Sequence, residues 1–155
     1  PAHCQALRGS IAKLTGGCLR MCSVRHKEGG AHGCRAEIHS VEMWASDGRL
    51  VAGELGFSCG ALYTSLTGFY TEDGAGTVQM LALGGLLIRA GCQCWDLGME
   101  MKYKSGLGAE ELDRKDFISL QRRLRVEPQL TFGALASDGL PAAELISLIV
   151  ASKAL

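Results

Sequence analysis

The sequence lacks any long hydrophobic run and any excess of charge of one sign. No stretch of about 18 apolar residues occurs in the 155-residue chain, so no membrane-spanning helix is expected. The longest apolar stretch, from Met80 to Ala90, has the length of a buried helix. Lys and Arg number 16, as do Asp and Glu, so no global basic field favours strong nonspecific binding of nucleic acid. The basic residues between Lys102 and Arg125 form either a local patch for such binding or a solvated helix face. Internal repeats and low-complexity tracts are absent as well.

Targeting signals are also absent from the sequence. No signal peptide or cleavage-site pattern is recognisable, and the sequence starts at Pro1 rather than Met, as expected of a processed or truncated product. The cysteines number seven, which is odd, and we expect free thiols in a reducing compartment. We therefore expect a cytoplasmic protein, with an organelle as the alternative.

Three potential metal ligands recur at helical spacing near the N-terminus. Cys18, Cys22 and His26 would lie on one face of a helix. The Cys-x3-Cys spacing, however, is not the tight spacing of strong zinc motifs. We therefore expect buried cysteines here rather than a metal site.

The composition is that of a globular protein of one domain. Hydrophobic residues make up 47% of the chain and charged residues 21%. A chain of this length can bury about two thirds of its unfolded surface, which allows an ordinary core. We expect the domain to occupy residues 1–125 and a helical C-terminal extension to occupy residues 126–155.

Turn signals and hydrophobic periodicity predict an α+β fold. Three antiparallel strands are expected over residues 34–45, 50–58 and 61–70, joined by turns at Asp47-Gly48 and Cys59-Gly60. A fourth strand over residues 92–99 follows a helix and should run parallel to the third strand. Helices are predicted over residues 2–22, 77–90, 100–107 and 114–124, and from Pro141 onward.

A glycine-rich turn joins the third strand to the long helix. Gly74 and Gly76 would let the backbone N–H groups of the helix start approach an anion. With Thr71 they resemble the pyrophosphate loop of the GNAT acyltransferases, although Thr71 stands where that loop has Arg or Gln. Glu72 and Asp73 would repel a phosphate. The turn is therefore either a CoA site or a plain helix start.

Two acids are candidates for catalysis. Asp96 lies in an apolar strand, where burial of a carboxylate is costly and such groups concentrate at functional sites. Its alternative role is to cap the following helix. Glu54 lies in the middle of the second predicted strand, on a face that either is exposed to solvent or lines the cleft as a second acid.

The residues around these acids resemble the catalytic domain of the bacterial leucyl/phenylalanyl-tRNA–protein transferases. The resemblance begins with the run from His39 to Trp44 and the run from Asp47 to Gly56. It continues through Phe69, Asp96, Ser105-Gly-Leu-Gly-Ala109 and Arg114-Lys-Asp-Phe117. It covers roughly residues 32–124, and it implies a GNAT-like fold, with a meander followed by a β-α-β unit.

The resemblance implies an aminoacyltransferase. The family moves Leu or Phe from a charged tRNA to the N-terminal Lys or Arg of a protein, which marks that protein for degradation in the N-degron pathway. The implied partners are therefore aminoacyl-tRNA and an acceptor N-terminus. No cofactor is implied, because the aminoacyl ester is already activated and needs only positioning and a path for the proton.

The resemblance also implies roles for individual residues. Asp96 stands at the position of the family's acid, which would relieve the attacking amine of its proton. The family's apolar pocket for the transferred side chain falls on Tyr63, Gly68, Met80, Leu83, Leu87 and Trp95. The sequence departs from the family at Gly98, where the family has Gln, and at Leu66, where it has Glu; Glu54 or Glu100 would compensate. The family's separate N-terminal domain has no counterpart in the sequence, so tRNA contacts made there are expected to be missing or to come from residues outside this chain.

Two rival functions remain open. An acyl-CoA-dependent N-acetyltransferase would use acetyl-CoA and would hold its pyrophosphate at Gly74 and Gly76. A catalytically inactive GNAT-like domain would only bind charged tRNA ends or protein N-termini. The sequence indicates neither the oligomeric state nor the acceptor.

Overall fold

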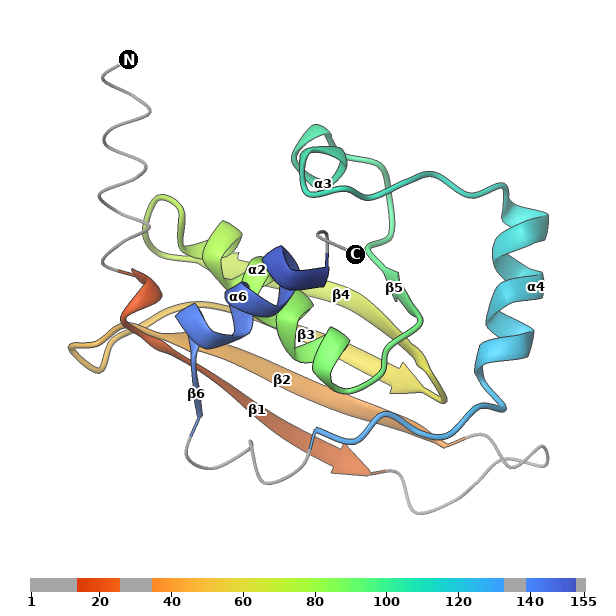
Figure 1. Ribbon diagram of the computed structural model, residues 1–155, viewed down its shortest axis with the longest axis horizontal. Helices are drawn as coiled ribbons and strands as arrows, with labels where there is room; N and C mark the ends of the chain where they lie inside the picture. The colour runs from red at the N-terminus through yellow and green to blue at the C-terminus, as the bar shows by residue number, and fades with distance from the viewer. Residues whose placement is uncertain (1–13, 26–34, 133–138, 153–155) are drawn as a thin grey trace.

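A computed structural model describes residues 14–25, 35–132 and 139–152 of the chain (Figure 1). The fold is α+β, as predicted. Its strands are β1 (Cys18–Arg25), β2 (Ala36–Trp44), β3 (Leu50–Cys59), β4 (Leu62–Tyr70), β5 (Cys94–Asp96) and β6 (Leu140–Pro141). Its helices are α2 (Ala75–Arg89), α3 (Lys102–Gly106), α4 (Arg114–Leu124) and α6 (Ala142–Ser152).

The strands form one mixed sheet in the order β5-β4-β3-β2-β1-β6. Strands β2, β3 and β4 make the predicted antiparallel meander, and β5 runs parallel to β4, so both expectations are confirmed. The pairing of β4 with β5 covers only Leu62 to Thr64 on β4. The rest of β4, as far as Tyr70, has no strand beside it on that side. The sheet therefore opens into a fork between β4 and β5.

The N-terminal helix predicted over residues 2–22 is wrong from residue 18 onward, although residues 14 and 15 are helical. Residues 18–25 form strand β1, which pairs with β2, and residues 1–13 lie outside the described part of the chain. Residues four apart share a face in a strand as well as in a helix, so Cys18 and Cys22 fit both patterns. Leu19 and Met21 are buried and alternate with them, which is the strand period.

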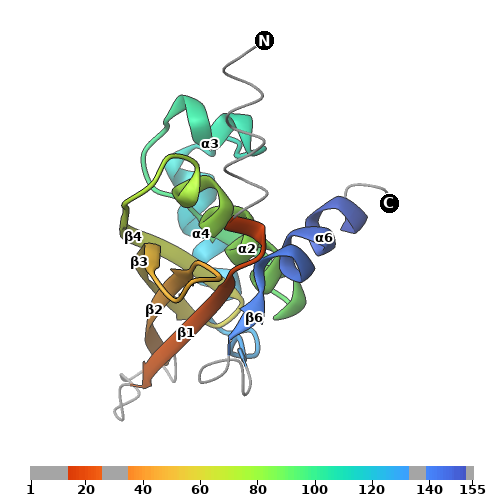
Figure 2. The ribbon, with the colours of Figure 1, turned by 90° about the vertical axis from the view of Figure 1, so that its left-hand side faces the viewer.

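Helix α2 lies against one face of the sheet, and α6 packs on α2 on the same side of the sheet (Figures 1 and 2). The glycine pair in α2 has its explanation in these contacts. A Cβ atom on Gly85 would lie 1.9 Å from the carbonyl oxygen of Leu145, so the two helices cross at this glycine. A Cβ atom on Gly84 would lie 3.2 Å from the ring of Trp95. Gly84 and Gly85 lower the helix propensity of α2, but their lack of a Cβ atom allows this close packing.

The C-terminal residues share the core of the sheet. Strand β6 pairs with β1, and the helix predicted after Pro141 is confirmed as α6. Ala142 and Leu145 are fully buried, together with core residues of the strands and of α2. A smaller apolar cluster joins Leu124 of α4 to the start of β4.

None of the helices in the described residues is long and apolar enough to cross a membrane.

The expectation of free thiols holds for most of the described cysteines. Cys18, Cys22, Cys92 and Cys94 are free. Cys59 is disulfide-bonded, so the expectation is wrong at this residue. A cysteine count cannot reveal such a bond, because pairing depends on which segments the fold brings together.

Candidate functional site

Two clefts adjoin at the fork between β4 and β5. The first, which we call the Glu54 cleft, has a volume of about 580 Å³ and is bounded by β3, β4, the start of α2 and residues 97–104. The second, the Asp96 cleft, has a volume of about 650 Å³ and extends from β5 over α3 to α4. Residues lining both clefts are Met80, Leu97, Met101 and Lys104. The shared walls make the fork a continuous candidate site.

Glu54 forms part of the floor of the first cleft and is only 9% exposed. Its Oε1 atom accepts hydrogen bonds from the Tyr63 hydroxyl, at 3.1 Å, and from Ser65 Oγ, at 2.8 Å. Its Oε2 atom accepts one from Gln79 Nε2 of α2, at 3.2 Å. Trp95 Nε1 in turn donates to Ser65 Oγ at 3.0 Å. The structure thus assigns Glu54 to the cleft, which was one of the two alternatives left open by the sequence.

A β-bulge and a glycine bring these donors to Glu54. Leu55 pairs with Thr67 and Gly56 with Ser65, so Leu66 is an extra residue on β4. The extra residue shifts the alternation of side chains along β4, so that Ser65 lies on the same face of the sheet as Glu54. A Cβ atom on Gly56 would lie 2.3 Å from the Tyr63 hydroxyl, so the ring passes over this glycine to reach the carboxylate.

Burial governs the ionisation of this cluster. Desolvation raises the pKa of Glu54, while the hydrogen bonds from Ser65, Gln79 and Tyr63 oppose that rise. The pKa of Tyr63 is raised far above its usual value, first by burial and then by the nearby carboxylate, so the hydroxyl stays a donor. The cluster is a carboxyl group surrounded by neutral donors in an apolar setting.

Asp96 lies at the end of β5 and lines the second cleft. Its Oδ1 atom accepts a hydrogen bond of 2.8 Å from the backbone N–H of Gly98, and Oδ2 accepts one of 3.3 Å from Thr64 Oγ1. The carboxylate is half-buried and is held on both oxygens. Because side chains alternate along a strand, Asp96 points to the face opposite Trp95. It therefore approaches the fork from the side of the sheet opposite α2.

Gly98 cannot be replaced by another residue without backbone strain. Its φ angle is +70°, in the left-handed region that glycine favours. The turn it makes is closed by its own N–H bond to Asp96. The position that holds Gln in the resembling family therefore has a different local backbone role here, which is to orient the acid.

Lys104 of α3 organises the loop between β5 and α3. Its Nζ atom donates to the carbonyl oxygens of Leu97, at 2.5 Å, and Met99, at 2.8 Å. Both clefts include Lys104 in their walls. Its charge therefore lies at the junction of the two clefts, although two of its three protons are committed to the loop.

The structure separates the residues assigned by resemblance to the apolar pocket. Gly68 lines the Glu54 cleft, Trp95 lines the Asp96 cleft, and Met80 lines both. Tyr63 is fully buried and reaches the first cleft only through its bond to Glu54. Leu83 and Leu87 lie in the core and line neither cleft.

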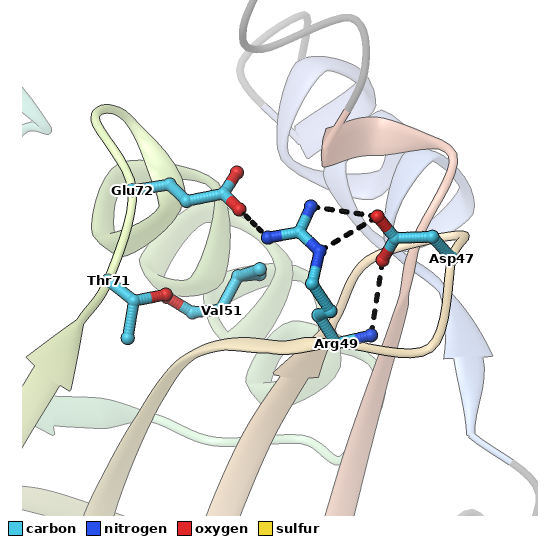
Figure 3. Close-up of polar contacts among 5 residues, drawn as sticks. All are labelled: Asp47, Arg49, Val51, Thr71 and Glu72. Carbon is cyan, nitrogen blue, oxygen red and sulfur yellow. Dashed lines mark hydrogen bonds and ion pairs between the residues drawn. The ribbon is translucent and has the colours of Figure 1, made fainter.

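Ion pairs connect the glycine turn before α2 to the β2–β3 hairpin (Figure 3). Arg49, in the β2–β3 hairpin, contacts the carboxylates of both Asp47 and Glu72. Arg49 lowers the pKa of Asp47 through these bonds. Gly74 has a φ angle of +84° and precedes the first helical residue, Ala75. Gly74 and Gly76 both line the Glu54 cleft, next to Asp73.

A second polar chain lies away from both clefts. His39 is fully buried; its Nδ1 atom is hydrogen-bonded to Ser23 Oγ and its Nε2 atom to Ser58 Oγ, each at 2.8 Å. Gln129 Nε2 donates to the same Ser58 oxygen at 2.8 Å. Desolvation lowers the pKa of His39 to about 4, so the ring is neutral near pH 7. Phe132 packs edge-on against this ring. The chain joins the sheet to the residues after α4.

No metal centre is formed by the described residues, in which no three His, Cys, Asp or Glu side chains converge. Of the three potential ligands, Cys18 and Cys22 lie on β1 rather than on a helix, and His26 lies outside the described residues. Cys18 is half-buried and Cys22 is exposed, so the expectation of buried cysteines is wrong at Cys22. The candidate site is therefore built from acids, amides and hydroxyls.

Sequence reasoning missed Gln79, Ser65 and Lys104. Gln79 is only 4% exposed and bonds to the Glu54 carboxylate. The one available signal was a lone amide between Val78 and Met80, immediately before the apolar stretch that begins at Met80. Ser65 and Lys104 gave no signal, because their partners are set by the bulge and by the loop after β5.

Comparison with known proteins gives one consistent result. A family model described as leucyl/phenylalanyl-tRNA protein transferase matches residues 24–122. The chain is 34% identical over 92 residues to the leucyl/phenylalanyl-tRNA–protein transferase of Shewanella woodyi, covering 59% of this chain and 39% of that protein. The similarity to the enzyme of that name from Shewanella sediminis is 34% over 100 residues, covering 64% and 39%.

A similarly named protein from Salmonella newport is 32% identical over 90 residues, covering 58% of this chain and 38% of the relative. The chain therefore spans about two fifths of the length of the curated relatives it matches. The matched segment contains β2 to β5, α2, α3 and most of α4, and hence both clefts.

Proposed function

Because this chain belongs to the leucyl/phenylalanyl-tRNA protein transferase family, we propose that it transfers Leu or Phe from aminoacyl-tRNA to the N-terminus of an acceptor protein. The observation that carries the proposal is the Asp96 carboxylate, which lines a cleft at the β4–β5 fork within the matched segment. Hydrogen bonds hold both of its oxygens in position, and general acid–base catalysis relies on a positioned side chain.

The reaction needs few chemical groups. The amine of the acceptor attacks the ester carbonyl, a C–N bond forms, and the C–O bond to the tRNA ribose breaks. The proton lost by the amine must reach the departing ribose hydroxyl. Asp96 would accept this proton and release it again, held in place by Gly98 and Thr64. No cofactor is needed, because the ester is already activated.

The finer assignments follow from the same proposal. A GNAT-like fold is supported by the order of elements, in which the meander is followed by α2 and by a parallel strand that diverges from β4. A role in the N-degron pathway, in the cytoplasm, would follow from transfer of Leu or Phe to a protein N-terminus. These assignments depend on the activity itself.

The rival N-acetyltransferase would place the pyrophosphate of acetyl-CoA at Gly74 and Gly76. Asp73 lies in the same wall, and Glu72 stands beside it with its charge directed to Arg49. The charge of Asp73 disfavours a phosphate at the turn, and this supports the use of tRNA over CoA.

Transfer of labelled leucine from Leu-tRNA to an Arg-initiated peptide tests the proposal, with acetyl-CoA turnover measured alongside. Labelled peptide formed only with Leu-tRNA is the expected result. Acetylation without leucyl transfer would favour the rival enzyme. Absence of both activities, with binding of charged tRNA retained, would favour an inactive binding domain.

A further inference from the structure

The buried carboxylate of Glu54 has no cationic partner among the described residues. The ion pairs found there join Arg49 to Asp47 and Glu72, and Arg89 to Glu144. Burying an ionised carboxylate among neutral groups is costly, and ionisable groups of this kind concentrate at functional sites. The position of Glu54 in a cleft wall makes a ligand the natural source of that compensation.

The hydrogen bonds of Glu54 leave room for one more donor. A carboxylate accepts about four hydrogen bonds. Oε1 receives two, from Tyr63 and Ser65, and Oε2 receives one, from Gln79. One acceptor position on Oε2 is therefore unused. A ligand that brings a donor to this atom completes the set.

The walls of the Glu54 cleft define the rest of the ligand. Met80, Phe69 and Met101 supply apolar surface, whereas the floor around Glu54 is polar. Gly68, the cross-strand neighbour of Glu54 on β4, has no side chain that could cover the carboxylate. This combination fits an aliphatic chain that ends in a charged donor.

The other charges at this cleft are Asp73 and Lys104. Asp73 is a second acid and reinforces a negative potential. Lys104 donates to the carbonyl oxygens of Leu97 and Met99 and is held at the junction with the other cleft. The charges facing the floor of the cleft thus favour a cation.

We propose that the Glu54 cleft binds the terminal ammonium or guanidinium group of a substrate and that Glu54 determines this specificity. The proposal rests on the proposed function for the identity of the substrate. In the proposed transfer of Leu or Phe, the basic group belongs to the first residue of the acceptor; a basic side chain on the transferred residue, in place of Leu or Phe, is the alternative that the transfer assays test. The cleft then differs from the wholly apolar pocket that the family resemblance implies.

Binding of small probes to the full chain tests the proposal independently of catalysis. n-Butylammonium and n-butylguanidinium carry the charged group, and 1-butanol is the neutral control. Titration followed by the NMR signal of the Gln79 side-chain amide should show at least about tenfold tighter binding of the cations than of 1-butanol, since charge-assisted hydrogen bonds are about twice as strong as neutral ones. Equal binding of all three would overturn the proposal.

The Glu54→Gln substitution should abolish the preference for the cations. The matched control is Glu42→Gln, because Glu42 is a half-buried acid on neighbouring β2 that bonds to Trp44 and lines neither cleft. Cation binding by Glu54→Gln equal to that of the original chain would contradict the proposal.

A measurement on the unsubstituted chain covers the case in which Glu54→Gln does not fold. The ¹³C signal of the Glu54 carboxyl should titrate at lower pH in the presence of n-butylammonium than in its absence, because a bound cation favours the ionised form. An unchanged titration would overturn the proposal.

Transfer assays then distinguish the two sources of the basic group. Lys-tRNA and Arg-tRNA are compared with Leu-tRNA as donors, each with peptides that begin with Arg or with Ala. A preference for basic donors that Glu54→Gln removes places the transferred side chain in the cleft. A preference for the Arg peptide that Glu54→Gln removes places the acceptor there. Cation binding without any transfer would leave this inference standing and would contradict only the proposed function.

Discussion

The ring of Tyr63 lies directly over Gly56, where a Cβ atom would stand 2.3 Å from the phenol oxygen. This contact lets the hydroxyl of Tyr63 bond to Glu54 at 3.1 Å. The glycine is thus part of the candidate site, although it lines no cleft. It sets how close a buried aromatic ring comes to a buried acid.

Replacing Gly56 by Ala should therefore destabilise the protein and disturb the cleft. Overpacking of a close-packed core costs about 1–3 kcal/mol, and Tyr63 is fully buried and cannot easily move. Urea denaturation should show a loss of this size. Gly106→Ala is the control, since a Cβ atom on Gly106 meets nothing within 4 Å. A Gly56→Ala protein as stable as the control would contradict the contact.

Stability should fall in mild acid because of His39. Burial lowers the pKa of His39 from 6.5 to about 4. Below pH 6.5 the unfolded chain therefore binds a proton on this ring that the native chain does not bind. The contribution of neutral His39 to the free energy of unfolding is therefore complete above pH 6.5. It decreases by about 3 kcal/mol in total as the pH falls toward 4.

Urea titrations between pH 4 and pH 8, compared for the original chain and His39→Gln, measure this contribution. The original chain should lose stability more steeply than His39→Gln as the pH falls through this range. Parallel pH profiles would show that His39 does not carry the effect.

Glu54 should produce a pH dependence of the opposite sign. Its pKa is raised in the native state, mainly by burial, so the native chain holds a proton above pH 4.5 that the unfolded chain has lost. Stability from this group is greatest at low pH and decreases as the pH rises from 4.5 through the native pKa. The difference in unfolding free energy between the original chain and Glu54→Gln should show this decrease. A difference that does not vary with pH would mean that the pKa of Glu54 is the same in both states.

Restoring Gln at position 98 should not improve the enzyme. Gly98 has a φ angle of +70°. For a residue with a Cβ atom, this left-handed backbone conformation costs about 1–2 kcal/mol of conformational free energy. Nothing lies within 4 Å of a Cβ atom there, so the backbone alone is responsible. Gly98→Gln should lower the unfolding free energy by about this amount and slow the transfer reaction. Faster transfer by Gly98→Gln would show that a side chain at this position serves the chemistry.

Local sequence patterns were sufficient to predict the β2–β3 hairpin and the helices α2 and α4. The Asp47-Gly48 turn and the alternation of β2 and β3 predicted the hairpin, and the apolar stretch predicted α2. Helix α4 was predicted with the limits it has in the structure, Arg114–Leu124. These features depend on residues close in sequence, whose periodicity and turn chemistry are visible in the chain itself.

The interior of the site could not be predicted in the same way. Alternation placed Glu54 on one face of β3, but it could not say which face α2 would cover. The bulge at Leu66, which brings Ser65 beside Glu54, leaves no mark in the sequence. Residues 18–22 were misassigned to a helix because spacing by four suits both a helix and a strand, and only pairing with β2 decides between them.

The most direct measurement is single-turnover transfer of labelled leucine from Leu-tRNA to an Arg-initiated peptide by Asp96→Asn. The asparagine can still accept the bond from Gly98 and bond to Thr64, so the local geometry should persist. Asp116→Asn, an exposed acid in the first turn of α4, is the control. We predict that Asp96→Asn lowers the rate by about 10²–10⁴-fold while Asp116→Asn leaves it unchanged. A rate for Asp96→Asn equal to that of the original chain would contradict the assignment of Asp96 as the group that takes the proton.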